Sequence, residues 1–453
     1  MEELWISREA GKVLDALSGA GIAAWIVGGC VRDMLRGETP KDWDVAAAAT
    51  PEEIKAALRD FRLIETGIRH GTVTALSEGV PIEVTACRGE GAYTDLRHPS
   101  EVTFHRSIRE DLSRRDFTVN ALAYAPDSGL IDLFDGLKDL RDGVIRCIRR
   151  PEDRFSEDAL RILRALRFSA VLGYEIEPNT AAAIHSLREN IRAVSAERCA
   201  AELSKLLLGD HAAEVLTEYA DVIEIVLPVI GPMRGFVHRP EHGGDLWRHS
   251  AEPLRWAPKD LAIRFALLLR DCAKPQSIKL GGDYPEHAAQ GALMAEQALR
   301  ELKLPSALIG RVTVLVRHHS ALPRPERSAV LRAMNYLGPE VLQDLVALRR
   351  ADRLAHGEDP REIDALQEKI KELTACGACY QLSQLAVSGD DLKALGYAGR
   401  EIGQTLQMLL FAVMDGKCEN TRPVLEAYLR TQAQSPAQQP PATPGNGCGH
   451  CSG

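Results

Sequence analysis

The sequence predicts an α+β protein, with a small mixed head and an all-α remainder. Short runs rich in β-branched and apolar residues alternate with helical stretches between residues 21 and 135. These runs are AAWIVGG (23–29), GTVTAL (71–76), PIEVTAC (81–87) and GLIDLF (129–134). From about residue 150 onward, apolar residues recur at helical spacing and strand signals almost vanish. A chain of 453 residues is also too long for one ordinary core, so several domains are expected.

The head is expected over residues 1–140 and includes a helix that begins after Thr50, a good N-cap with Glu53 three residues later. All-α parts follow: a neck over 141–235, a histidine-rich body over 236–360 and a tail over 361–432. Residues 433–453 are rich in Pro, Gln, Gly and Ser and are predicted to be disordered.

The composition, 45% hydrophobic and 26% charged, is that of a soluble globular protein. No stretch approaches the roughly 20 unbroken apolar residues of a membrane span, and the N-terminus resembles an amphipathic helix more than a signal peptide. A cytoplasmic protein without a membrane partner is therefore expected. The net charge of −9 argues against a coat of nucleic acid, but it leaves room for a local basic track.

The ten cysteines are scattered, as expected for reduced thiols in the cytosol. Two CxxC pairs occur, Cys376–Cys379 and Cys448–Cys451. A structural zinc site needs four ligands, and these pairs lie in very different surroundings. Ordinary buried or tail thiols are therefore favoured over zinc.

The strongest signal for chemistry is IVGGCVRDMLRGETPKDWDVA, residues 26–46. A strand that ends in Gly28-Gly29 lets the backbone approach phosphates, and the following helix directs its first N–H groups toward them. Arg32 adds a charged donor. Asp42 and Asp44 are two residues apart in a predicted strand, so both carboxylates lie on one face, where hard oxygen ligands suit Mg²⁺. A lone GG or DxD would be an ordinary turn or strand end; their order and spacing favour a catalytic site.

GGCVRD followed by DWD resembles motif A of the class II tRNA nucleotidyltransferases, the bacterial CCA-adding enzymes and their poly(A) polymerase relatives. The resemblance spans roughly residues 20–430. It includes SRRDFTVNALA (113–123), RFSEDALRILRALRF (154–168), VSAERCAAELSKLL (194–207) and LAVSGDDLKALGYAGREIG (385–403). It implies a polymerase-β-like nucleotidyltransferase head that uses Mg²⁺. The implied reaction transfers C and A residues from CTP and ATP to the 3′ end of tRNA and releases pyrophosphate.

The resemblance also implies roles for single residues. Arg115 is expected to contact the nucleotide, with the region of Asp116 and Asn120 facing the ribose. Arg164 and Arg167 resemble residues that hold the triphosphate, although their three-residue spacing rotates Arg167 far around a helix from residue 158. The segment VSAERCAAELSKLL resembles a helix that braces the recognition segment, and 385–403 resembles a tRNA-contacting segment.

Asp158 and Arg161 are three residues apart, which would make them neighbours on one helix face. Cytosine and adenine each carry an amino donor beside a ring-nitrogen acceptor. A carboxylate and an arginine match that pattern, whereas uracil and guanine present the reverse order. The pair is therefore expected to select C and A without a nucleic-acid template. The alternative is a surface ion pair worth about 0.2–0.5 kcal/mol.

RGEGAYTDLRHPSEV (88–102) resembles the flexible loop of the family members that add A, so A addition is favoured. The loop does not separate a CCA-adding enzyme from an A-adding enzyme or a poly(A) polymerase, and these alternatives stay open.

The predicted body resembles an HD phosphohydrolase domain, in which a His-Asp doublet and further histidines bind a metal. The residues in question are His238, His242, His249, Arg270-Asp271, His287, His318-His319 and Asp352. Arg270 stands where the histidine of the doublet belongs, and arginine cannot coordinate a cation. A structural scaffold is therefore favoured over a working second metal site. A function of another class, an RNA-binding protein or phosphohydrolase with an inactive head, is disfavoured by the presence of Asp42, Asp44 and Arg115.

Overall fold

The computed structural model describes residues 4–68, 71–90, 102–104, 106–237, 244–279 and 287–434. The chain divides into two compact units. Unit 1 comprises residues 1–320 and 347–358, and unit 2 comprises 321–346 and 359–453. Residues 321–346 of the predicted body therefore group with unit 2, and the boundaries of neck, body and tail stay predictions.

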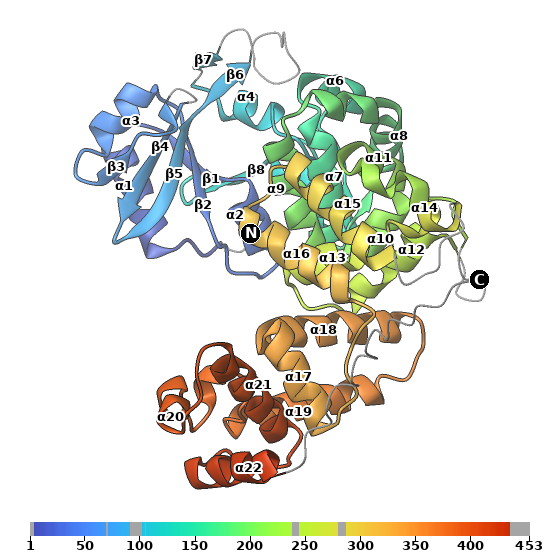
Figure 1. Ribbon diagram of the computed structural model, residues 1–453. Helices are drawn as coiled ribbons and strands as arrows, with labels where there is room; N and C mark the ends of the chain where they lie inside the picture. The colour runs from blue at the N-terminus through green and yellow to red at the C-terminus, as the bar shows by residue number, and fades with distance from the viewer. Residues whose placement is uncertain are drawn as a thin grey trace, which may run out of the picture. The chain divides into compact units, whose positions relative to one another are not determined.

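The head of unit 1 is built on a seven-stranded sheet in the order β3-β4-β5-β2-β1-β8-β9 (Figure 1). Strands β2 and β5 run parallel, and the other neighbouring pairs are antiparallel. All four runs that the sequence predicted as strands lie in this sheet. Its strands are β1 (Ala24–Val27), β2 (Trp43–Ala47), β3 (Arg62–Ile64), β4 (Thr72–Ser77), β5 (Val80–Ala86), β8 (Leu122–Ala125) and β9 (Gly129–Asp132).

Three helices, α1 (Arg8–Gly19), α2 (Gly29–Leu35) and α3 (Pro51–Ala57), pack against one face of this sheet. The side chains of the central strand alternate, so Trp43, Val45 and Ala47 enter the core under these helices. The opposite face carries a smaller cluster that includes Ala46. Helix α3 begins as predicted, because Thr50 and Glu53 form a capping box.

The rest of unit 1 is almost entirely helical, as predicted, with α7 packed on α9 and α16 on both α13 and α15. Its helices are α4 (Ile108–Ser113), α5 (Gly136–Asp142), α6 (Pro151–Glu157), α7 (Leu160–Leu172), α8 (Pro178–Leu187), α9 (Ala196–Leu207), α10 (Ala212–Glu218), α11 (Ala220–Val226), α12 (Leu246–Ala251), α13 (Leu261–Leu269), α14 (Lys274–Lys279), α15 (His287–Glu301) and α16 (Ser306–His318). Two short strand pairs join β6 (Arg88–Glu90) to β7 (Val102–Phe104) and β10 (Val144–Ile145) to β11 (Glu175–Ile176).

Unit 2 has its own apolar core between helices, which includes Val330, Leu366 and Leu410. Its helices are α17 (Arg327–Leu337), α19 (Arg361–Ala375), α20 (Gly389–Ala394), α21 (Arg400–Met414) and α22 (Arg422–Gln434). Helix α18 (Pro339–Ala355) contributes residues to both units.

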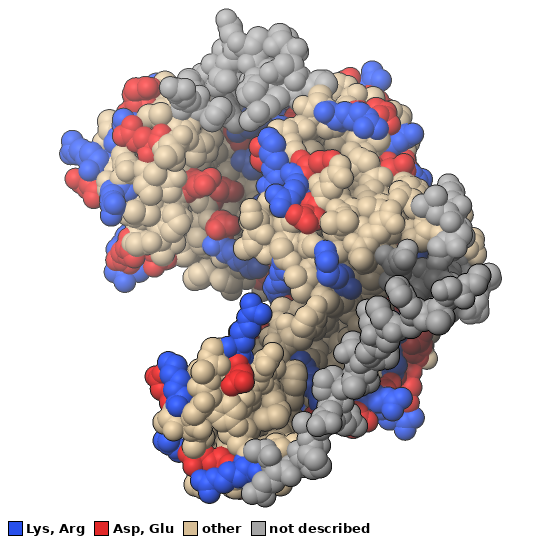
Figure 2. Space-filling model, in the orientation of Figure 1, with Lys and Arg blue, Asp and Glu red and all other residues tan. Residues whose placement is uncertain are grey.

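Several predicted segments lie wholly or largely outside the described residues: the loop over 88–102, the tail over 433–453 and the Cys448–Cys451 pair. Cys376 and Cys379 are free thiols. None of the helices in the described ranges combines the length and hydropathy that a membrane crossing requires. On the face drawn in Figure 2, basic and acidic side chains are interspersed.

Candidate active site

The carboxylate of Asp44 lies on the face of the head sheet that helices α1 to α3 leave uncovered. Its neighbours Trp43 and Val45 point into the core on the other face, so strand alternation directs Asp44 away from it. Asp42 comes two residues earlier, is exposed, and lies close enough for its charge to raise the pKa of Asp44. The two predicted metal ligands are therefore neighbours at the start of strand β2.

A third carboxylate, Glu83, lies beside this pair and was missed in the sequence. Glu83 of strand β5 is the register partner of Asp44 in the parallel β2–β5 pairing, so both side chains occupy the same face. In the predicted strand PIEVTAC, Glu83 stands between Ile82 and Val84, whose side chains face the core. That alternation marks an outward position, but it does not identify the neighbouring strand.

The electrostatics of this acidic group favour a bound cation. Burial is the main cause that raises the pKa of Asp44 to about 6; Glu83 and Asp42 act in the same direction, and the Arg115 guanidinium opposes them. A divalent cation offsets both the cost of burying this carboxylate and its repulsion by Glu83 and Asp42, and carboxylate oxygens are hard ligands. The residues present thus fit a metal site.

Gly28 and Gly29 form the turn from strand β1 into helix α2, as predicted. Gly28 has a φ of 75°, and a Cβ on it would lie 2.6 Å from Nη1 of Arg115. Glycine at this position therefore lets Arg115 approach the turn. The thiol of Cys30 accepts a hydrogen bond from the backbone N–H of Asp44 at 3.5 Å, which joins helix α2 to strand β2.

A buried polar chain joins the predicted arginines of α2 and α7. Arg32 donates to Oδ1 of Asn120 at 2.7 Å, and Asn120 donates to Oδ1 of Asp116 at 3.3 Å. Arg164 donates from Nε to Oδ2 of Asp116 at 2.7 Å. Asp116 and Asn120 are both buried. They were expected near the ribose, and in the structure they link Arg32 to Arg164.

Arg167 lies deeper than Arg164 and donates to the buried carboxylate of Glu202 on helix α9 at 2.5 Å. The side chain of Arg167 is 14% exposed, against 35% for Arg164. Glu202 belongs to VSAERCAAELSKLL, which was expected to brace this region. Arg164 is therefore the better placed of the two to reach a nucleotide.

Asp158 and Arg161 do not lie together on one helix, contrary to the expected geometry. Helix α6 ends at Glu157, and Asp158 has an extended backbone before α7 begins. Its Oδ1 accepts from the Leu160 N–H at 3.1 Å, and its Oδ2 accepts from Arg198 at 2.8 Å. Arg161 instead pairs with Glu157 at 2.5 Å. The break arises because an aspartate caps a helix start well.

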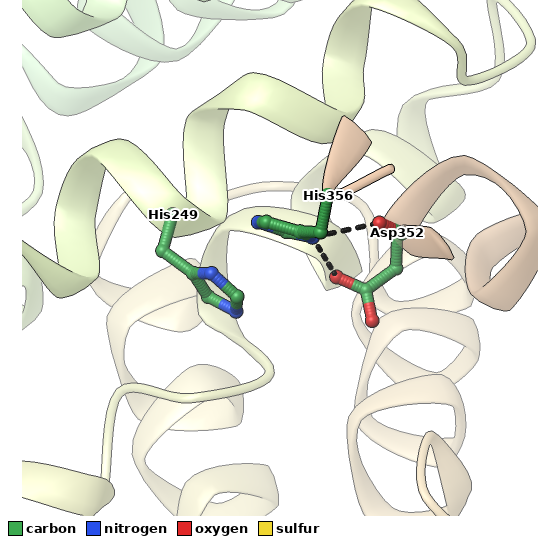
Figure 3. A group of neighbouring side chains, drawn as sticks. All are labelled: His249, Asp352 and His356. Atoms are coloured by element: carbon green, nitrogen blue, oxygen red, sulfur yellow. Dashed lines mark hydrogen bonds and ion pairs between the residues drawn. The ribbon is translucent and has the colours of Figure 1, made fainter. Parts of the chain in front are cut away.

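A second group of ionisable residues, which we call the histidine core, is buried in unit 1. It holds two clusters with metal-ligand composition: His249, Asp352 and His356, and Asp271, His287 and His319. Figure 3 shows His249 beside His356, whose other neighbour is Asp352. The two rings stack with centroids 4.0 Å apart, and Nδ1 of His356 lies 3.3 Å from Oδ1 of Asp352. The predicted residues His238 and His242 lie outside the described residues.

The histidine core does not fit a metal ion, because its carboxylates are already paired with fixed cations. Arg270, 2% exposed, places Nη2 2.6 Å from Oδ1 of Asp352 and Nε 3.5 Å from Oδ2 of Asp271. The ammonium of Lys274 lies 2.8 Å from the other oxygen of Asp271. A divalent cation would have to displace these charges.

Two histidines of this core, His249 and His319, make the stability of the protein depend on pH. Burial lowers the pKa of His249 to about 3 and that of His319 to about 4. Their stabilising contribution is complete above the unfolded value near 6.5 and is lost as the pH falls. For each of the two histidines, the free energy of unfolding should therefore fall by about 1.4 kcal/mol for every pH unit below 6.5, until the folded pKa is reached.

Urea unfolding at pH 7 and pH 5 measures this slope, with the His249→Gln variant expected to show a shallower one. His185→Gln serves as the control, since that side chain is 41% exposed and pairs with Asp221 outside the core. Equal unfolding free energies at both pH values in the unchanged chain would contradict the prediction.

Comparison with known proteins first defines the class. The poly A polymerase head domain matches residues 24–146, a probable RNA and SrmB-binding site of polymerase A matches 173–230, and a putative tRNA nucleotidyltransferase domain 2 matches 288–429. A polymerase-type head with an acidic central strand is that of a nucleotidyltransferase, and the predicted α+β fold with a polymerase-β-like head is confirmed.

The particular family follows from relatives of similar length. The chain is 34% identical to the CCA-adding enzyme of Enterococcus faecalis, over 94% of this chain and 96% of that protein. Identity to the CCA-adding enzyme of Leuconostoc mesenteroides is 49%, over an alignment that spans 51% of that enzyme. The crystal structure of the Bacillus stearothermophilus CCA-adding enzyme in complex with CTP is 28% identical, with a TM-score of 0.73 over 94% of this chain and 97% of that one. This chain belongs to the CCA-adding enzyme family.

Proposed function

We propose that this chain adds C and A residues from CTP and ATP to the 3′ end of tRNA and releases pyrophosphate. The single observation that carries the proposal is the group of carboxylates around Asp44, set in a chain that is similar to CCA-adding enzymes over nearly its whole length. An RNA-binding protein with an inactive head would not require three neighbouring carboxylates beside an arginine.

Asp42 and Asp44, with Glu83 beside them, would hold Mg²⁺. When bound, this metal activates the attacking 3′-hydroxyl and stabilises the departing pyrophosphate. Arg115, whose charge acts on Asp44 and which lies at the turn of Gly28, would contact the phosphates of the nucleotide. Arg164, one-third exposed and fixed by Asp116, is placed to donate to the triphosphate.

A defined set of tRNA ends tests the proposal. Transcripts that end at the discriminator base, at C and at CC are incubated with CTP or ATP alone and with both. We expect CTP to extend the first two transcripts, ATP to extend the third, and growth to stop after A. Extension of the CC transcript alone would indicate an A-adding enzyme, and continued addition of A would indicate a poly(A) polymerase. No extension of any transcript would refute the proposed function.

We also propose that the protein works in the cytoplasm. The cysteines of the described ranges are free thiols, five of them buried in the head and the helices of unit 1. Such thiols persist where the surroundings are reducing.

The histidine core should hydrolyse little or no phosphodiester as it stands, because Arg270 occupies the position of a metal ligand. Hydrolysis of a 2′,3′-cyclic nucleotide is measured with Mn²⁺, Ni²⁺ or Mg²⁺ present. Arg270→His, which restores a His-Asp doublet, is the variant in which metal binding could emerge. Robust metal-dependent hydrolysis by the unchanged chain, lost in Asp271→Ala, would overturn this prediction.

A further inference from the structure

Three of the arginines singled out in the sequence surround one buried ring, that of Phe168. The guanidinium carbon of Arg167 lies 3.8 Å from the ring centroid, that of Arg32 5.4 Å and that of Arg164 5.5 Å. These distances are within the range of cation–π attraction. Phe168 is 6% exposed, and periodicity alone would assign it to the apolar core of helix α7.

The arrangement is unusual because like charges gather in a largely buried place. Two buried carboxylates, Asp116 and Glu202, hold Arg164 and Arg167 from the side. Arg32 pairs with Asp33, its neighbour on α2, at 2.7 Å and donates to Asn120. These partners come from different parts of the chain: helix α2, the segment after α4 and helix α9. The negative face of an aromatic ring is the element that all three guanidinium groups share.

The ring itself is held in a defined orientation. Phe117, fully buried, packs on Phe168 edge to face, with centroids 5.8 Å apart and an angle of 81° between the ring planes. A ring fixed in this way presents its face at a constant position. Arginines attracted to that face are therefore fixed relative to one another as well.

We propose that Phe168 is a positioning residue that presents Arg164 and Arg32 to the triphosphate of the incoming nucleotide. Arg164 has the most exposed of the three side chains, 35%, whereas those of Arg32 and Arg167 are 10% and 14% exposed. Arg164 is thus the direct donor, and Arg32 and Arg167 complete the charged wall behind it. This inference rests on the proposed nucleotidyl transfer and assigns Phe168 no contact with substrate.

Removing the ring while keeping apolar volume tests this role. Phe168→Leu should raise the KM and the Kd for CTP and for ATP about tenfold, with a smaller change in kcat. Phe168→Tyr keeps the aromatic face and should recover most of the affinity. Phe265→Leu, the same change in a buried phenylalanine of helix α13, controls for a general loss of packing.

Fluorinated phenylalanines at position 168 separate electrostatics from shape, because each added fluorine weakens the negative face with little change in ring shape. The Kd of CTP, measured calorimetrically with Mg²⁺ and without tRNA, should rise with each fluorine from one to three. A flat series would overturn the proposal even if Phe168→Leu fails to fold. If the unchanged chain extended none of the tRNA transcripts, the proposed function itself would fail, an outcome that this binding series does not test.

Discussion

Replacing Asp42 or Asp44 by alanine should lower the rate of nucleotide transfer by on the order of a thousandfold or more, while tRNA binding stays nearly intact. Each change removes a hard oxygen ligand from the acidic group at the start of strand β2. The alanine side chain has no atom that could bind the metal in its place. Single-turnover transfer of CMP to a tRNA transcript, with tRNA binding measured in parallel, separates chemistry from binding.

The Asp127→Ala variant is a matched control, because Asp127 is exposed in the turn between β8 and β9 of the same head. Glu83→Gln belongs to the same series and should give an intermediate loss, since Glu83 neighbours Asp44 in register. Transfer within tenfold of the unchanged chain in either aspartate variant would contradict the assignment of this site.

The position of Asp42 and Asp44 on one face of strand β2 could be predicted because it depends on local sequence. Alternation along a single strand places Trp43 and Val45 inward and Asp44 outward. The turn at Gly28-Gly29 could likewise be predicted from the two glycines alone. Glu83 could not be placed in the same way. Its position next to Asp44 depends on the pairing and register of strands that are about 40 residues apart, which no local pattern specifies.

The arginines around Phe168 were identified in the sequence, but their common partner was not. Arg32 was identified as a charged donor after the Gly28-Gly29 turn, and Arg164 and Arg167 from the resemblance. Phe168 and Glu202 were not identified, because a core phenylalanine and a helix-face glutamate have ordinary local patterns. Their contacts with Arg167 exist only once α7 packs on α9. By contrast, the interpretation of Arg270 needed only the chemistry of the residue type, and the ion pair with Asp352 agrees with it.

The helix break at Asp158 was missed because apolar spacing is continuous across it. Phe155, Ala159 and Ile162 are all buried at i, i+4 and i+7, so the period of a single helix is maintained through the break. The available signal was Asp158 itself, since aspartate is among the residues that begin helices best. As a result, Asp158 and Arg161 are held by separate partners, Arg198 and Glu157.

Replacing Asp158 by alanine should therefore weaken the choice of base more than the chemistry. If Asp158 accepts from the amino group of C or A, its loss leaves that donor unpaired, and a site built around such a bond loses discrimination. We expect use of UTP and GTP to rise relative to CTP and ATP, with a lower overall rate. Arg161→Ala should lower the use of CTP and ATP together, because both bases share the ring-nitrogen acceptor.

A purely structural role of Asp158 is the competing explanation. Asp158 caps the start of α7 and pairs with Arg198, so a purely structural role predicts a lower Tm with unchanged preference. Asp158→Asn keeps an oxygen that can cap Leu160 but loses the charge that Arg198 holds. Comparing kcat/KM for all four nucleotides in the unchanged chain, Asp158→Asn and Asp158→Ala decides between the two roles. If the preference ratios of Asp158→Ala stay within about twofold, a difference under ~0.5 kcal/mol, then Asp158 joins two helices and another group selects the base.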